Sequence, residues 1–329
     1  MYKVAILGCG NHGKGHDWNK IPDCQLVAVC DIVEQRARDR AETYGVPYYL
    51  DADEMFDKEE IDIVDAPVRE KDRFTVVMKC LTRNKHVFTE KPLGGEEGQY
   101  RVRLNDIPKV RAIMDEWQKR DVQLGICFTM HGTNTFRWAE QVIRSTDFGA
   151  LTVVDARCTW GAWNHLLDMF RYLGGEVDEV FAHADAAWQS KTVSVKFANG
   201  AVGNVMTSNR LWVPYVFEVK WVAEKGQVHV EDLTDAWART GDGRSAAAKA
   251  LSVRDDPVLG QKCDGGTMRV QHMTDFVASI KERRRFVADG WAGMRHMEID
   301  AAITESILSG QPVKIERYQP EQGRTIFSK

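Results

Sequence analysis

The stretch VAILGCGNHG, residues 4–13, decides the fold of the first part of this 329-residue chain. Four apolar residues, long enough for a short buried strand, run directly into glycines at the spacing G-x-G-x-x-G, which are Gly8, Gly10 and Gly13. Missing side chains at these positions allow a tight turn, close approach of a pyrophosphate and close packing of a helix on the strand. We therefore expect the loop, with Asn11 and His12 inside it, to hold a dinucleotide at the N-terminus of a following helix.

Beyond this loop, short apolar runs alternate with segments of helical spacing as far as residue 126. The expected strands cover residues 4–7, 26–30, 47–50, 61–64, 86–89 and 122–126. The expected helices lie between the first two strands and over residues 32–44 and 73–84. Such an alternation is typical of a parallel sheet covered by helices on both faces. We expect residues 1–125 to form an α/β Rossmann domain with a doubly wound parallel sheet.

The second part of the chain has a different pattern, dominated by successive strands over residues 151–232. Asn199-Gly200 between two apolar runs predicts a hairpin, because a tight turn there needs a positive φ. We expect helices over residues 136–145, 163–173, 268–284 and 297–309, an irregular connection over 242–266 and a last strand over 311–315. Adjacent strands of this kind favour antiparallel pairing. Residues 126–329 are therefore expected to form a second, α+β domain.

Composition and charge exclude several classes of partner. A formal net charge of -4 and a pI near 6.2 provide no basic surface for nucleic acid or an anionic membrane. The seven cysteines are scattered without paired spacing, as expected of reduced thiols in the cytoplasm. No charged leader or long apolar run precedes the glycine loop, so we expect the mature chain to begin at Met1.

Asp31 ends the second expected strand, where a carboxylate can accept hydrogen bonds from ribose hydroxyls. A carboxylate there repels a 2′-phosphate, which favours NAD. NADP stays open, because Arg36 and Arg38 lie a few residues farther along. Four potential metal ligands crowd this region, but their spacing matches no known pattern and we expect no metal: Cys9, His12, His16 and Cys30.

Glu90, Lys91 and Pro92 follow the strand expected over residues 86–89. Their position is the carboxyl edge of the sheet, where ligands bind in open α/β folds. A surface ion pair before a turn is the alternative interpretation.

Together, residues 5–10, 27–31, 85–93 and the tail from 289 to 313 resemble the Gfo/Idh/MocA family, that is, the glucose-fructose oxidoreductase and inositol dehydrogenase family. The resemblance covers nearly the whole chain and implies a Rossmann domain followed by a domain with an open, mostly antiparallel sheet. It implies oxidoreduction of sugars or polyols with NAD or NADP, usually in a homo-dimer or homo-tetramer. It also assigns Lys91 to the active site, in contact with cofactor and substrate, with Glu90 positioning it. An ammonium group beside a hydroxyl stabilises the alkoxide that forms as hydride leaves.

The segment NHLLD, residues 164–168, resembles the family's active-site helix. The match implies that His165 serves as general base and that Asp168 orients it, since i and i+3 side chains share a helical face. A structural histidine is the alternative. The chain departs from the family at Gly161, where many members carry an aspartate, and in a shortened loop before His165. Residues 66–70 also replace the usual Thr-Pro-Asn near the nicotinamide.

Several other residues are candidates of lower rank. Trp160 and Trp163 flank the shortened loop and could stack on a sugar face, whereas core packing is the simpler explanation for Trp221. A carboxylate or a phosphate on the substrate could bind to Arg157, Arg171 or Arg210. The extra segment 94–106 either covers the site or is a solvated loop.

We expect an NAD-dependent dehydrogenase of a secondary hydroxyl on a sugar, glycoside or polyol. Two alternatives stay open. One is a lyase, epimerase or glycosidase that oxidises its substrate transiently with tightly bound NAD. The other is an NAD-binding regulatory protein without turnover, suggested by Gly161 and the shortened loop.

Overall fold

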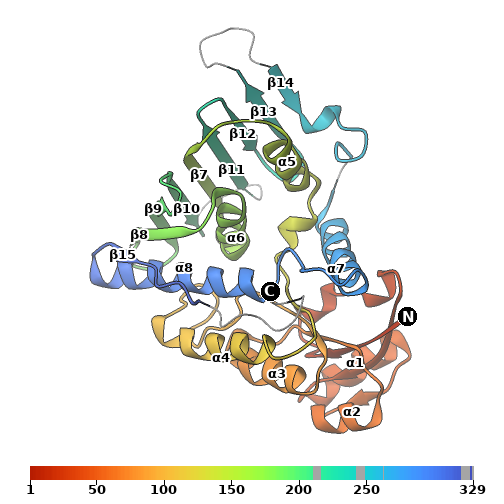
Figure 1. The fold of residues 1–329 in the computed structure, drawn as a ribbon. Helices are drawn as coiled ribbons and strands as arrows, with labels where there is room; N and C mark the ends of the chain where they lie inside the picture. The colour runs from red at the N-terminus through yellow and green to blue at the C-terminus, as the bar shows by residue number, and fades with distance from the viewer. Residues whose placement is uncertain (210–215, 242–248, 262, 320–326, 328–329) are drawn as a thin grey trace. The chain divides into compact units, whose positions relative to one another are not determined.

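The computed structural model describes residues 1–209, 216–241, 249–261, 263–319 and 327 (Figure 1). The chain forms two compact units, the first made of residues 1–128, 269–297 and 318–329 and the second of residues 129–268 and 298–317. The sequence predicted one boundary, between residues 125 and 126. The first unit does end its N-terminal segment nearby, at Phe128, but two later segments return to it.

The first unit contains a six-stranded sheet in the order β3-β2-β1-β4-β5-β6, with every paired strand parallel. The strands are β1 (Tyr2–Leu7), β2 (Cys24–Cys30), β3 (Tyr48–Tyr49), β4 (Ile63–Ala66), β5 (His86–Thr89) and β6 (Leu124–Ile126). All four residues of β4 are buried, as expected of a central parallel strand covered on both faces. The predicted doubly wound Rossmann sheet is confirmed.

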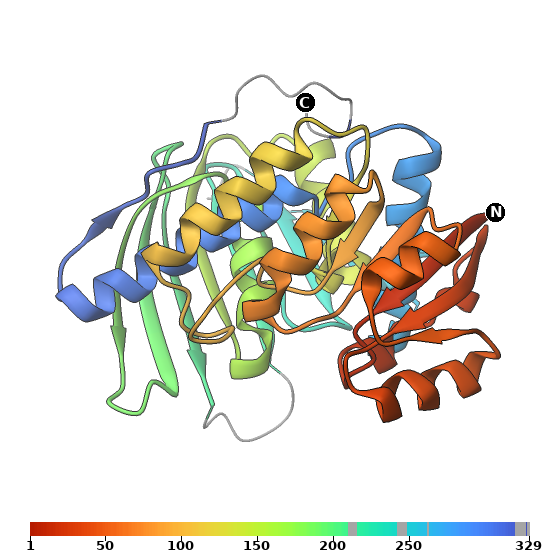
Figure 2. The ribbon, with the colours of Figure 1, turned by 90° about the horizontal axis from the view of Figure 1, so that it is seen from below.

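Four helices connect these strands: α1 (Glu34–Tyr44), α2 (Ala52–Lys58), α3 (Glu70–Thr82) and α4 (Ile107–Trp117). Figure 2 shows α3 and α4 side by side, in orange and yellow. Helix α1 ends where Gly45 adopts φ +66, a left-handed conformation that costs glycine little. The sequence did not single out α2 or α4, although Asp51 caps α2 and Pro108 lies in the first turn of α4.

The helix expected between β1 and β2 does not form, so that prediction is wrong. Two 3-10 turns take its place, η1 (Gly13–Gly15) and η2 (Trp18–Lys20). The connection fits the glycine loop, the two 3-10 turns and a turn before β2 into residues 8–23. The buried Arg40 donates hydrogen bonds to the carbonyls of Gly13 and His16, at 2.6 and 2.9 Å. It thereby satisfies carbonyls that helix amides would otherwise pair.

The C-terminal return to the first unit has a clear packing reason. Parts of α7 (Gly265–Lys281) and α8 (Gly290–Ser309) lie within residues 269–297. The amide of Ile126 in β6 donates to the carbonyl of Ala288 at 2.7 Å, and the Phe276 ring lies 5.1 Å from that of Phe88. Residues far away in the sequence thus cover the free edge of the parallel sheet and its apolar face. A domain boundary drawn at one point of the chain does not include them.

The second unit contains a nine-stranded sheet in the order β14-β13-β12-β11-β7-β10-β9-β8-β15. The strands are β7 (Leu151–Thr159), β8 (Val177–Ala184), β9 (Ser190–Phe197), β10 (Val202–Ser208), β11 (Phe217–Ala223), β12 (Gly226–Val230), β13 (Ala236–Thr240), β14 (Lys249–Ser252) and β15 (Val313–Lys314). Only the β7–β10 pair is parallel; the other pairs are antiparallel. The predicted hairpin at Asn199-Gly200 joins β9 to β10, with Gly200 at φ +88. The mostly antiparallel second sheet is confirmed.

Helices α5 (Asn134–Ser145) and α6 (Trp163–Gly174) lie against one face of this sheet (Figure 1). Strand β7 shows the consequence, because Val154, Ala156 and Cys158 are buried while the intervening Asp155 and Arg157, and Val153 before them, are exposed. No helix of the described residues covers the opposite face. Within the expected irregular connection 242–266, the described residues contain β14 and a 3-10 turn, η6 (Val253–Asp255), while 242–248 and 262 lie outside the description.

No helix in the described part of the chain is long and apolar enough to cross a membrane.

Candidate active site

The glycine loop at the end of β1 has the geometry of an anion cradle. Gly8 adopts φ +111, and a Cβ on Gly13 would lie 2.7 Å from the Gly8 carbonyl oxygen, so both positions require glycine. A Cβ on Gly10 would meet no atom within 4 Å, so this glycine leaves open space above the loop. In the described part of the chain, no oxygen accepts a hydrogen bond from the amides of residues 10–13. Four successive amides are therefore available to a bound anion.

Asp31, at the end of β2, lies against the same loop. Its carboxylate accepts hydrogen bonds from the amides of Cys9 at 2.7 Å and Val33 at 2.8 Å. Each oxygen keeps a second lone pair for an outside donor such as a ribose hydroxyl. Ile32 beside it is 91% exposed, and Arg38 pairs with Glu34 at 2.6 Å. Among the described residues, no arginine forms an ion pair with this carboxylate. No arginine held there would therefore bind a 2′-phosphate.

Lys91 stands in a turn that the first unit holds firmly. The turn follows β5 and contains a cis Lys91–Pro92 peptide bond. The buried guanidinium of Arg73 donates hydrogen bonds to the carbonyls of Pro92 and of Val68, the latter at 2.6 Å. Burial lowers the pKa of Arg73 to about 10, which still leaves the side chain charged near neutral pH. Arg73 is a positioning residue that the sequence did not reveal.

The segment 94–106 reaches the ammonium of Lys91. Lys91 Nζ donates to Gln99 Oε1 at 3.2 Å, and Val102 in the same segment is fully buried. The segment is therefore partly packed and partly solvated, since Leu104 within it is 51% exposed. Gln99 therefore occupies one of the three donors of the Lys91 ammonium.

Glu90 does not project to the surface as an ion pair with Lys91. It is 6% exposed, and its Oε1 lies 3.3 Å from His16 Nε2, whose other ring nitrogen lies 2.8 Å from Asp65 Oδ2. Burial alone would lower the pKa of His16, but Asp65 raises it well above its ordinary value. Burial would raise the pKa of Glu90, yet the contacts with His16 and Lys91 hold it well below its ordinary value. Glu90 is thus a buried carboxylate that faces a buried imidazolium.

In the second unit, His165 and Asp168 lie in the first two turns of α6 and have different surroundings. His165 is partly exposed, whereas Asp168 is fully buried. The carboxylate of Asp168 lies 2.7 Å from His131 Nε2 and 3.5 Å from Arg171. The orientation of His165 by Asp168 stays a prediction. The i and i+3 positions point about 60° apart, so the Asp168 side chain enters the core while His165 stays at its edge.

The shortened loop before His165 consists of one 3-10 turn, η5 (Trp160–Ala162), between β7 and α6. Trp163 is fully buried and donates from Nε1 to Asp300 at 2.9 Å, so it is a core residue and not a stacking platform. Trp160 remains partly exposed, and Trp221 is a core residue as expected. Gly161 is exposed, with no neighbour near a Cβ.

The three candidate arginines are equally distinct. Arg157 on the outer face of β7 pairs with Glu218, and Arg171 pairs with Asp168 and Glu176. Arg210 lies outside the described residues. Both described arginines already pair with carboxylates, so neither guanidinium is left to bind an anionic substrate.

Comparison with known proteins finds related oxidoreductases. Residues 2–114 match the model of an oxidoreductase family with an NAD-binding Rossmann fold. Over 96% of its length, the chain is 23% identical to inositol 2-dehydrogenase of Rubrobacter xylanophilus, of which the match covers 94%. The chain is thus similar to the Gfo/Idh/MocA oxidoreductases, whose family model matches it over residues 2–114.

Other relatives extend this comparison. Myo-inositol 2-dehydrogenase of Thermotoga maritima is 25% identical over 71% of this oxidoreductase and 76% of its own length. The fold is similar to that of levoglucosan dehydrogenase in complex with NADH and levoglucosan, with a TM-score of 0.84. That match has 18% identity and covers 96% of this chain and 100% of the other.

The first unit of this oxidoreductase fits NAD. The pyrophosphate fits the open space above Gly10 and the available amides of residues 10–13. A ribose fits beside the Asp31 carboxylate. The fit does not depend on a helix N-terminus, because only the 3-10 turn η1 follows the loop. NAD supplies a hydride acceptor, and the protein's task is to hold and orient it.

Proposed function

We propose that this oxidoreductase transfers hydride between a secondary hydroxyl of a sugar, glycoside or polyol and NAD. The observation that carries the proposal is the placement of Lys91. Its turn, the glycine loop and Asp31 follow strands β5, β1 and β2 of one parallel sheet, so all three lie at the same carboxyl edge. Inositol and levoglucosan dehydrogenases, to which the chain is similar, support a cyclic polyhydroxylated substrate.

In this proposal the ammonium of Lys91 contacts the substrate hydroxyl and stabilises the alkoxide as the C–H bond gives up its hydride. Gln99 holds the ammonium when no substrate is bound. Glu90 and Arg73 act through the turn, because the contact of Glu90 with His16 anchors the residue before Lys91, and Arg73 anchors the carbonyl of Pro92 after it. They are positioning residues.

We propose that His165 takes up the hydroxyl proton during oxidation and returns it during reduction. Its partial exposure and its place in the family's active-site helix support this role. Asp168 is fully buried, so we propose that it acts as a positioning residue that orients His165 and not as a group that touches the substrate. It also contacts His131 and Arg171.

The test is a substrate screen with NAD⁺ in which NADH absorbance reports turnover. The panel contains myo-inositol, levoglucosan and common pyranoses, each also offered as the ketone with NADH. We expect at least one cyclic polyol to give turnover that Lys91→Ala and His165→Ala each reduce by two or more orders of magnitude. Activity unaffected by both substitutions would refute the residue roles. Substrate consumption without net NADH would point instead to transient oxidation with recycled NAD, and failure of every hydroxyl substrate to reduce bound NAD would favour a regulatory role.

The surroundings of Asp31 support NAD over NADP as the cofactor used in turnover. Discrimination is measured as the ratio of kcat/KM for NAD⁺ and NADP⁺. We expect Asp31→Ser to reduce that ratio, because it removes the charge that repels a 2′-phosphate.

We also propose that the chain assembles with copies of itself through the outer face of the nine-stranded sheet. Three apolar side chains on β7 and β10 are exposed there: Val153 at 37%, Val202 at 50% and Met206 at 46%. A face of this kind buries apolar surface when a second copy covers it, which supports a dimer or tetramer. The seven free cysteines, most of them buried, support a reducing compartment such as the cytoplasm.

A further inference from the structure

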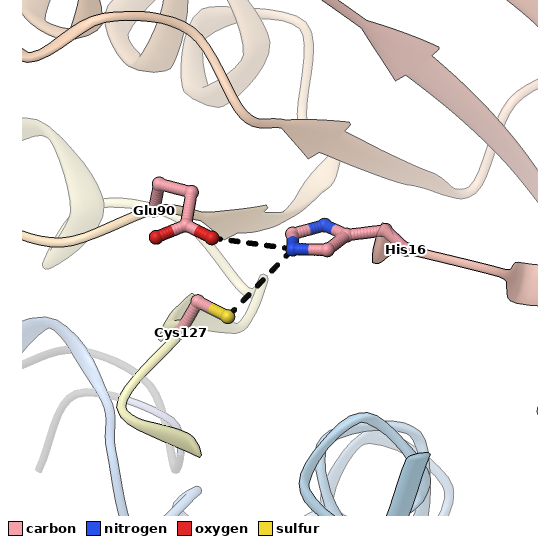
Figure 3. A group of neighbouring side chains, drawn as sticks. All are labelled: His16, Glu90 and Cys127. Atoms are coloured by element: carbon pink, nitrogen blue, oxygen red, sulfur yellow. Dashed lines mark hydrogen bonds and ion pairs between the residues drawn. The ribbon is translucent and has the colours of Figure 1, made fainter. Parts of the chain in front are cut away.

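Three potential metal ligands from distant parts of the sequence converge inside the first unit (Figure 3). His16 belongs to the short connection between β1 and β2, Glu90 follows β5, and Cys127 follows β6. His16 Nε2 lies 3.3 Å from Glu90 Oε1 and 3.8 Å from Cys127 Sγ, and all three atoms lie within 4.8 Å of one another. The residues are 0%, 6% and 1% exposed, so bulk water does not compete for these atoms.

The two ring nitrogens of His16 differ in the length of their hydrogen bonds. Nδ1 lies 2.8 Å from Asp65 Oδ2, the normal length of a charge-assisted hydrogen bond. Nε2 can carry only one hydrogen, yet it faces both an oxygen at 3.3 Å and a sulfur at 3.8 Å. The Cys127 thiol carries a second hydrogen, so two protons lie among three ligand atoms whose contacts are long. One divalent ion carries the same charge as these two protons.

The spacing fits a tetrahedral zinc-like ion. Bond lengths of about 2.0 Å to nitrogen and oxygen and about 2.3 Å to sulfur place the ligand atoms of a tetrahedral site about 3.3 to 3.5 Å apart. The observed 3.3 and 3.8 Å from His16 Nε2 lie close to these values, and the Glu90–Cys127 separation, within 4.8 Å, closes to them by rotation of the two side chains. We propose that His16, Glu90 and Cys127 bind one divalent zinc-type metal ion.

The surroundings of His16 are those of a ligating histidine. Asp65 accepts from the ring nitrogen that faces away from Glu90 and Cys127, and it also accepts from Trp18 Nε1 at 2.8 Å. A carboxylate in this position fixes the tautomer that leaves Nε2 free to ligate, as outer-shell carboxylates do in metal sites. The Asp65 side chain is itself fully buried, so its orientation is set by packing.

The charge of the buried group also balances. When the ion binds, the Cys127 thiol and the Nε2 of a protonated His16 each release a proton, so a charge of +2 replaces two protons. The net charge beside Arg73 and Lys91 stays the same. A tetrahedral ion with three protein ligands keeps a fourth position for water.

The ion would secure the part of the Rossmann unit in which the expected helix is absent. It would join the short connection at His16 to the ends of β5 and β6, next to the turn that carries Lys91. The linear sequence concealed the site because Glu90 and Cys127 are 74 and 111 residues from His16. The site does not depend on the proposed dehydrogenase activity.

Cobalt(II) titration of the intact, chelator-treated protein tests the proposal, because Co²⁺ occupies zinc-type sites and a thiolate ligand adds a charge-transfer band in the near ultraviolet. We expect one Co²⁺ per chain with that band, loss of the band in Cys127→Ser, and competition by Zn²⁺. Cys80→Ser is the matched control, since Cys80 is another fully buried thiol of the same unit, in α3, and its loss should leave the band intact.

X-ray absorption of the zinc-loaded wild-type protein provides a second measurement that needs no variant. We expect one sulfur and two or three nitrogen or oxygen neighbours. Absence of Co²⁺ binding to the folded wild type, a band that persists in Cys127→Ser, or a zinc shell without sulfur would overturn the proposal. The group would then be an ion network held by protons alone.

Discussion

Substitution of Gly10 by alanine separates cofactor binding from folding. An alanine Cβ at this position meets no protein atom within 4 Å, and the backbone there does not need a positive φ. We therefore expect the free energy of unfolding to change by less than about 0.5 kcal/mol, as is usual at open positions. The added methyl group does, however, enter the space above the loop that a pyrophosphate would use.

The expected loss of affinity follows from the contacts that the methyl group disturbs. Holding the phosphate away from one amide costs about 1.5–3 kcal/mol, the worth of a hydrogen bond to a charged group. That cost corresponds to a roughly tenfold to hundredfold rise in the Kd for NADH. Isothermal titration and thermal unfolding measure the two quantities on the same sample.

Two further glycines serve as controls. Gly13→Ala should reduce stability and binding together, because its Cβ would lie 2.7 Å from the Gly8 carbonyl oxygen. Gly161→Ala, also without a neighbour within 4 Å, should change neither. An unchanged Kd in Gly10→Ala would show that the cofactor does not approach this loop, and the assignment of the glycine motif would fail.

Three other predictions concern the turn, a buried histidine and the sheet face. Lys91→Ala should lower kcat by about 10² to 10⁴-fold while the Kd for NADH changes far less. Lys20→Ala, at an exposed lysine, is the control. An equal loss of kcat and of NADH affinity would make Lys91 a cofactor ligand only. Burial lowers the pKa of His86 from 6.5 to about 4, so below pH 6.5 the unfolded chain binds a proton that the folded chain does not. Stability should therefore fall by up to about 3 kcal/mol between pH 6.5 and 4, and urea titrations should show this fall disappearing in His86→Gln; an equal fall in both proteins would contradict the assignment. Val202→Glu should dissociate the oligomer in sedimentation experiments whereas Val258→Glu, another exposed apolar position, should not; a monomeric wild type would refute the proposed interface.

The part of the fold that follows local patterns could be predicted from the sequence. Each strand of the parallel sheet is a short apolar run, and Asn199-Gly200 specified its hairpin through backbone conformation alone. The helix between β1 and β2 was predicted wrongly because the glycine motif usually precedes one, whereas here two 3-10 turns follow it. The return of residues 269–297 to the first unit depends on tertiary packing around β6, which no local pattern encodes.

The residues of the candidate site also divide into those that the sequence could locate and those that it could not. Lys91 and Asp31 could be located because each follows directly after a recognisable strand, and the strand ends of a parallel sheet share one edge. Arg73, His16 and His131 could not, because their importance lies in a partner far away in the chain: Pro92, Glu90 and Asp168. The spacing of His165 and Asp168 indicates that they share a helical face, but it does not indicate that Asp168 is fully buried while His165 is partly exposed.

The placement of Lys91 is a property of the first unit alone. Thr89 at the end of β5 accepts from the Cys127 amide at 2.8 Å and donates to the Ala66 carbonyl at 2.8 Å, so the strand end before the turn is held from both neighbouring strands. Arg73 holds the turn after it. The lysine, the glycine loop and Asp31 therefore form one rigidly supported set, built by parallel strands that the motif VAILGCGNHG begins. Two departures from the family, Gly161 and the reduced turn before α6, lie in the second unit. The third, residues 66–70, lies in the first unit, where Pro67 and Val68 stand beside Gly13 and Gly8 of the glycine loop. The first two departures are therefore separated from the cofactor-binding features, whereas the third adjoins them.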